Sequence, residues 1–119
     1  MRSEPHRAAD CLQDIADNIV RIERYTAGLD ERDLEKDDLR HDAVERCLER
    51  ICEAAVRLGD RAAELLPDHP WADIRGMGNR LRQAYDRMDA SIVWNVVKER
   101  LPKLQADIAI AMARIPEGR

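Results

Sequence analysis

Apolar residues recur along this chain at steps of three and four, and no other feature restricts its fold as strongly. Leu12, Ile15, Ile19 and Ile22 follow this spacing near the start of the chain, which places all four on one face of an α-helix. The sequence contains no Phe, and aromatic residues make up only 3% of it. A core must therefore be built from small aliphatic side chains at helical spacing, which favours helices packed on helices over a β-sandwich.

The same spacing, together with turn residues, divides the chain into successive helices. Gly28 and Gly59 are expected to end the first two, because glycine is common just past a helix C-terminus. Pro102 interrupts a continuing apolar pattern and should kink the last helix or begin a new one. The expected helices cover about residues 6–27, a segment ending at 58, residues 61–66, residues 71–85, and the region after an N-cap at Asp89. We predict one domain over residues 1–119, an all-α antiparallel up-and-down bundle of four to five helices.

Acidic residues outnumber basic ones, giving a net charge of −4 and a pI near 5.4. This balance argues against a general nucleic-acid coat protein but leaves room for a local basic patch. Acids gather over residues 30–45, where eight of them stand against three basic residues. The part from Asp30 to Asp38 is also poor in apolar residues, so we expect a solvated connection that leads into a helix N-terminus.

The cysteines and histidines give no sign of a metal or cofactor site. The cysteines lack zinc-type spacing and are interpreted as small buried residues in a reducing cytosol. The histidines lie near expected helix ends or turns, where capping or solvent exposure explains them. No apolar run approaches the ~18 residues of a membrane helix, so we expect a soluble, cytoplasmic protein. These residues are Cys11, Cys47, Cys52, His6, His41 and His69.

The stretch of residues 76–86, GMGNRLRQAYD, gathers two glycines, two arginines, two amides and a tyrosine at the end of the expected helix over 71–85. Each of its two glycines would cost up to about 1 kcal/mol against Ala inside a helix, so we expect a close backbone approach there. Arg75, Arg80, Arg82 and Arg87 lie in or beside the stretch, and a guanidinium matches the geometry of phosphate oxygens. Arginine is also the usual cation of this chain, and by charge alone this explains the cluster better than a phosphate site does. Tyr85 alone fits an amphipathic packing residue.

Residues 69–85, HPWADIRGMGNRLRQAY, resemble the signature of HepT-like proteins in the HEPN superfamily. The resemblance extends over most of the chain, in the same order. Its other parts are DAVER at 42–46, ICEAAVRL at 51–58, DASIVW at 89–94 and LPKL at 101–104. The resemblance implies an all-helical homodimer that acts as a metal-independent ribonuclease without a cofactor. It further implies the toxin half of a toxin–antitoxin pair, whose nucleotidyltransferase antitoxin silences the toxin by transferring AMP to a tyrosine.

The family motif runs arginine, a polar residue, three further residues, histidine, one residue and tyrosine. In this chain Asn79 matches the polar position and Tyr85 matches the tyrosine, which makes Tyr85 the implied AMP acceptor. Gly78 stands at the arginine position and Gln83 at the histidine position. A carboxamide cannot exchange a proton near neutral pH, and loss of general acid–base catalysis costs about 10²–10⁴ in rate. The resemblance therefore implies an RNA-cleaving site at Asn79, Arg80 and Gln83 that is inactive or impaired.

Two questions stay open from the sequence. Arg80 and Arg82 are both candidates for the phosphate-binding cation, since neither holds the family's arginine position. The chain is either a natural pseudo-toxin or a deliberately inactivated variant. The alternative to a ribonuclease is a non-catalytic dimeric helical module that only binds a nucleotidyltransferase partner.

Overall fold

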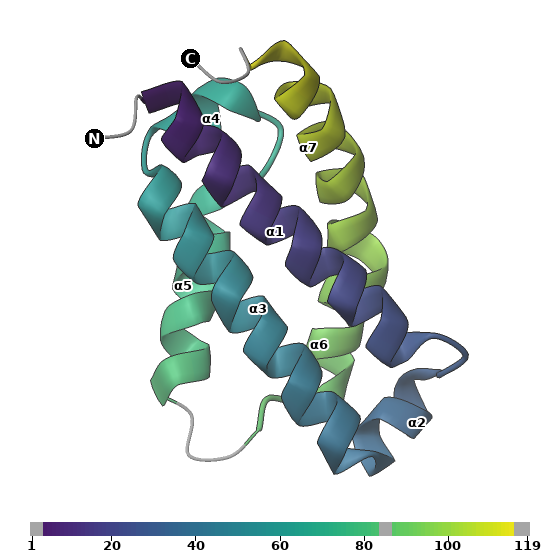
Figure 1. The fold of residues 1–119 in the computed structure, drawn as a ribbon. Coiled ribbons are helices and arrows are strands. Elements are labelled where there is room, and N and C mark those ends of the chain that lie inside the picture. Colours follow the sequence, from purple (N-terminus) through teal and green to yellow (C-terminus); the bar gives the residue numbers. More distant parts are fainter. Residues whose placement is uncertain (1–3, 84–86, 116–119) are drawn as a thin grey trace.

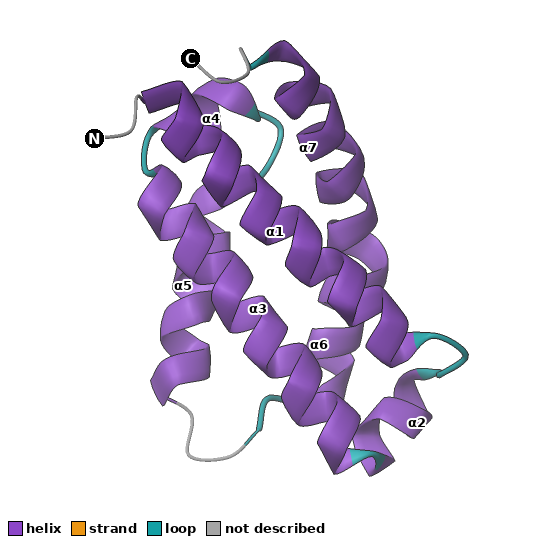
Figure 2. Cartoon of the chain, viewed as in Figure 1, coloured by secondary structure: helices purple, strands orange, loops and turns teal. Residues whose placement is uncertain are grey.

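The computed structural model describes residues 4–83 and 87–115, and every regular element within these ranges is a helix (Figures 1 and 2). The elements are α1 (Glu4–Thr26), α2 (Glu31–Lys36), α3 (Asp38–Leu58), α4 (Arg61–Leu65), α5 (Trp71–Gln83), α6 (Ala90–Asn95), a π-helical turn η1 (Val96–Arg100) and α7 (Leu101–Arg114). Three long helices and a fourth helical segment, made of α6, η1 and α7 in succession and called the composite rod, form a bundle. Two short helices, α2 and α4, lie in the connections.

The rods alternate in direction, as the up-and-down prediction requires. In Figure 1, α1 descends, α3 returns upward, α5 descends and the composite rod α6–η1–α7 rises again. Helix α2 lies in the lower connection and α4 in the upper one. The predicted all-α antiparallel bundle is thus confirmed.

Helix α3 occupies the centre of the bundle, packed against both α1 and α5. The face of α1 carrying Leu12, Ile15, Ile19 and Ile22 is buried, with no side chain of the four more than 1% exposed. Opposite it, α3 buries its own apolar residues over much of its circumference: Val44, Cys47, Leu48, Ile51, Cys52, Ala54, Ala55 and Leu58. This small-aliphatic core is the one that the composition predicts.

The glycine and proline predictions are confirmed by the backbone. Gly28 and Gly59 have φ angles of 77° and 56°, the left-handed conformation that glycine adopts most easily. Pro102 lies in the first turn of α7. Just before it, the Leu101 N–H donates to the Val96 carbonyl, so the chain passes through a wider π-helical turn and the helix restarts at the proline.

Residues 30–38 are more ordered than a solvated connection. Residues 31–36 form α2, whose capping box joins the Asp30 carboxylate to the Asp33 N–H at 2.8 Å and the Asp33 carboxylate to the Asp30 N–H at 3.0 Å. The hydrogen bond from the Asp33 N–H lowers the pKa of Asp30. Leu34 is completely buried, so one apolar residue in an acidic segment is enough to anchor a helical turn against the bundle.

No helix of the described ranges is long and apolar enough to cross a membrane.

Candidate functional site

Helix α5 carries the candidate residues that the structure describes, and its N-terminal end is firmly anchored. Trp71 is buried, and its indole N–H donates to the Leu66 carbonyl at 2.8 Å. Further along, Met77 and Leu81 are buried against the bundle. The polar residues Asn79, Arg82 and Gln83 are exposed in the last turns of the helix.

The two glycines of α5 differ in their surroundings. A β-carbon built on Gly78 would lie 2.7 Å from the Cys52 Cβ of α3, whereas one built on Gly76 would meet nothing within 4 Å. Because real β-carbons essentially never come within 3.0 Å, α5 and α3 can pack this closely only with glycine at position 78. The predicted close approach is therefore confirmed at Gly78 and wrong at Gly76.

Arg82 lies over Gly78 and beside Asn79. Its Nη1 is 3.4 Å from the position that a β-carbon on Gly78 would take, and its Nη2 donates to the Asn79 Oδ1 at 2.5 Å. The Cys52 thiol lies close to the Arg82 guanidinium. Burial raises the pKa of this thiol to about 11, while the positive charge of Arg82 opposes the rise. The structure thus brings together Gly78, Asn79, Arg82 and Cys52.

Arg80 faces a different part of the surface. It lines an open cavity of about 730 Å³ between α5 and the composite rod α6–η1–α7. Arg82 and Asn79 do not line this cavity. Gln83 follows Asn79 by four residues and Arg80 by three, which places it on the same helical face as both. Tyr85 lies outside the described residues.

The arginines of α5 have no acidic partner among the residues that the structure describes. The ion pairs of residues 4–83 and 87–115 include none to Arg75, Arg80 or Arg82. By contrast, Arg87 lies 3.0 Å from the Asp38 Oδ1 and also donates to the Glu35 carbonyl. The α5 guanidinium groups therefore retain donors for an external anion, while Arg87 is used within the fold.

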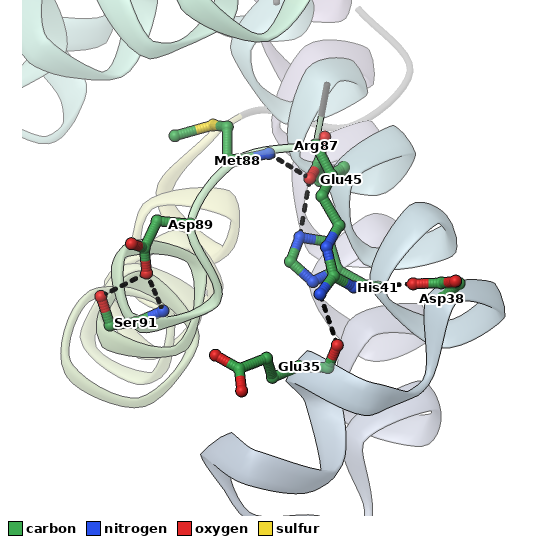
Figure 3. Close-up of polar contacts among 8 residues, drawn as sticks. All are labelled: Glu35, Asp38, His41, Glu45, Arg87, Met88, Asp89 and Ser91. Carbon is green, nitrogen blue, oxygen red and sulfur yellow. Dashed lines mark hydrogen bonds and ion pairs between the residues drawn. The ribbon is translucent and has the colours of Figure 1, made fainter.

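The chain that follows residues 84–86 is held against α3 (Figure 3). The Met88 N–H donates to the Glu45 Oε2 at 2.7 Å, and the same oxygen lies 2.7 Å from the His41 Nε2. The contact with His41 has the length of an ion pair, although neither ring nitrogen makes a well-directed hydrogen bond. Arg87 and Met88 thereby fix the start of the segment that leads into α6.

Two of the histidines differ from the prediction. The side chains of His41 and His69 are only 0% and 7% exposed, and His69 lies 2.7 Å from the Asp107 carboxylate of α7. Both are buried beside a carboxylate, and neither caps a helix or stands in solvent. For His41 the sequence does contain a usable signal, since Glu45 follows it by one helical turn. For His69 the partner lies on a distant helix, which sequence spacing does not reveal.

The cysteines agree with the sequence interpretation. Cys11, Cys47 and Cys52 are free and buried. Burial also raises the pKa of Cys47. Within residues 4–83 and 87–115 no three His, Cys, Asp or Glu side chains gather as the ligands of a metal ion would. Sequence reasoning missed the part that Cys52 plays in the site, because its closeness to Gly78 is a tertiary contact.

Comparison with known proteins identifies the family. The model of the family described as Ribonuclease HepT-like matches residues 15–110. The chain belongs to the HepT-like ribonuclease family. A probable ribonuclease HepT of Thermococcus cleftensis is 35% identical over 96 residues, which cover 81% of this chain and 87% of that protein. A putative RNase of Methanocaldococcus jannaschii is 29% identical over 99 residues, which cover 83% of this chain and 91% of that protein. No solved structure matches the chain at a significant level.

The two glycines of this HepT-like helix provide a matched pair of substitutions. Gly76→Ala should stabilise the fold by about 0.5–1 kcal/mol, because alanine is the better helix former and its methyl group meets open space. Gly78→Ala should destabilise it by about 1–3 kcal/mol, because the added methyl group overpacks the contact with Cys52. Urea denaturation of both variants checks the difference. Equal effects at the two positions would contradict the close contact between α5 and α3.

Proposed function

We propose that this protein is a HepT-like toxin that binds RNA through α5 and whose ribonuclease site is impaired at the proton-transfer step. The observation that carries the proposal is the arrangement at the end of α5, where Arg82 and Asn79 lie together and Gln83 is exposed one turn after Asn79. The family, and the similarity to proteins named as ribonucleases, support RNA as the substrate.

In the reaction implied by the family, the RNA 2′-hydroxyl attacks the adjacent phosphate and the 5′-oxygen leaves. The attack requires a group that removes a proton, and the departure requires a group that supplies one. The Gln83 carboxamide can only hydrogen-bond. One of the α5 arginines, Arg80 or Arg82, can stabilise negative charge on the phosphate, a separate contribution that does not need a titrating side chain. RNA binding should therefore survive where cleavage is weak.

We test the proton-transfer step with Gln83→His. The purified variant should cleave single-stranded RNA about 10²–10⁴ times faster than the unaltered protein, because an imidazole restores a proton-exchanging group at this position. Cleavage is followed on a labelled oligonucleotide with EDTA present. Gln83→Asn serves as the control that changes the side chain without adding a titrating group. If both variants and the parent cleave RNA at the same rate, a group other than residue 83 transfers the proton. If none of them cleaves or binds RNA, the protein is the non-catalytic module that binds a nucleotidyltransferase partner.

The proposal includes a homodimer that forms across the cavity beside α5. Its lining includes the apolar side chains Ile74, Met77, Ile92 and Val96 together with Arg80. Ile92 is a large hydrophobic residue that is 49% exposed. A two-fold axis at this cavity would bring the α5 helices of the two copies together, because an isologous contact uses the same surface on both.

Substitutions of two exposed isoleucines test the dimer. Ile92→Glu should convert the dimer into a monomer, because it places a charge in the proposed interface. Ile110→Glu is the matched control, since Ile110 is similarly exposed at 52% but lies on α7 outside the cavity lining. Sedimentation velocity measures the mass of each. A parent protein that is monomeric at micromolar concentration would contradict the proposal, as would dissociation by Ile110→Glu alone.

The proposed regulation is transfer of AMP to Tyr85 by a nucleotidyltransferase antitoxin. The phenolic oxygen would attack the α-phosphate of ATP, forming a phosphodiester and releasing pyrophosphate. With ATP and the antitoxin, intact-mass spectrometry should find the added AMP in the parent and in Tyr25→Phe, but not in Tyr85→Phe. These are the only two tyrosines in the chain. Modification of the Tyr85→Phe variant, or none in any variant with an active antitoxin, would contradict this step and favour the simple binding module.

A further inference from the structure

Position 78 of α5 is a glycine, and the packing of α5 on α3 leaves no room there for a side chain. The family motif carries an arginine where this chain has Gly78. The nearest atom to a β-carbon at that position is the Cys52 Cβ, at 2.7 Å, and Cys52 is completely buried in the middle of α3. No side chain fits at position 78 while α5 and α3 remain in this contact. A cation for this part of the site must come from another residue.

The guanidinium of Arg82 already lies in that place. Long side chains on a helix point back toward its N-terminus, so a residue at position 82 covers the surface one turn earlier. Here the Arg82 Nη1 comes within 3.4 Å of the β-carbon position on Gly78. Arg82 therefore supplies a guanidinium beside Gly78, although no side chain fits at position 78 itself.

Asn79 orients the Arg82 guanidinium without neutralising it. The Asn79 Oδ1 accepts one hydrogen bond from the Arg82 Nη2, and a guanidinium has five N–H donors. Arg82 is exposed and has no carboxylate partner within the described ranges. The remaining donors can therefore bind a phosphate in the bidentate manner that arginine favours.

Arg80 cannot take this place. Residues two apart on a helix do not face each other, and Arg80 lines the cavity between α5 and the composite rod instead. In the proposed dimer that cavity is the interface. The two arginines thus lie on opposite flanks of the face that carries Asn79 and Gln83.

We propose that Arg82, oriented by Asn79 over Gly78, is the residue that binds the RNA phosphate in this chain, and that the contact between Gly78 and Cys52 is what assigns this role to it. The inference rests on the proposed function, since it names the cation of that same site. Arg82 is then a binding residue, Asn79 a positioning residue, and Cys52 the determinant of which arginine can act.

The first experiment compares the two arginines. Binding of a fluorescein-labelled single-stranded RNA is measured by anisotropy in the parent, and its cleavage is measured in Gln83→His. Arg82→Ala should weaken binding about tenfold or more, the effect of losing charged hydrogen bonds. In the Gln83→His background it should lower cleavage about 10²-fold or more. Arg80→Ala, the matched control, should change either quantity by less than about threefold. Arg82→Lys should recover little, because an ammonium group lacks the planar fork.

The outcomes separate this inference from the proposed function. The inference would be overturned if Arg80→Ala weakened RNA binding and Arg82→Ala did not, or if both weakened it equally. Either result would still leave an RNA-binding protein. Absence of RNA binding by the parent and of cleavage by Gln83→His would overturn both. Asn79→Ala gives a further readout: it should weaken binding less than Arg82→Ala, and should have no effect when added to Arg82→Ala.

A second experiment places an arginine at position 78 instead of position 82. In the Arg82→Ala background, Gly78→Arg together with Cys52→Gly should restore RNA binding, because removing the Cys52 side chain makes room for one at position 78. Gly76→Arg in the same Cys52→Gly, Arg82→Ala background is the control and should not restore it. A folded triple variant without recovered binding would overturn the inference, with folding checked by thermal melts followed by circular dichroism. If the triple variant does not fold, the comparison of Arg82 with Arg80 decides alone.

Discussion

The contact between the α5 backbone at Gly78 and the Cys52 Cβ of α3 fixes how α5 is rotated about its own axis. With glycine at this point the two helices approach closely, and Met77 and Leu81 of the same helix are buried in the core. The directions of the polar residues follow from this setting. Arg82 comes to lie over Gly78, and Arg80 lies at the cavity on the opposite flank.

Helix α3 serves as the common support of the site. Its middle holds Cys52 against α5, and its N-terminal half holds the segment before α6 through the bond from the Met88 N–H to Glu45. The completely buried His41 lies beside the same carboxylate. The Glu45 carboxylate is half-buried and meets both a backbone donor and an imidazole, so α3 holds the chain that follows residues 84–86 as well as α5. The site is therefore built on rigid elements even though its polar side chains are exposed.

In the proposed site, anion binding and the proton-transfer position belong to different residues. Arg82 and Asn79 form a unit through their hydrogen bond, while Gln83 stands one turn beyond Asn79 on the exposed face. Electrostatic stabilisation and general acid–base catalysis contribute separately to a rate. A glutamine at the proposed proton-transfer position removes one contribution and leaves the other, which is the physical basis for proposing RNA binding without efficient cleavage.

The sequence by itself determined the long helices and their order, because these depend on interactions within about four residues: apolar spacing, glycine at a C-terminus and proline in a first turn. It also indicated the family, through motifs spread over most of the chain. The proposed changes at the motif positions of Gly78 and Gln83 also come from the sequence alone. Only the tertiary structure decided that Leu34 anchors α2, that His41 is buried, and that Gly78 rather than Gly76 meets α3. The proposed choice of Arg82 over Arg80 rests on the same kind of contact. Each depends on a partner distant in the sequence, which a local pattern cannot identify.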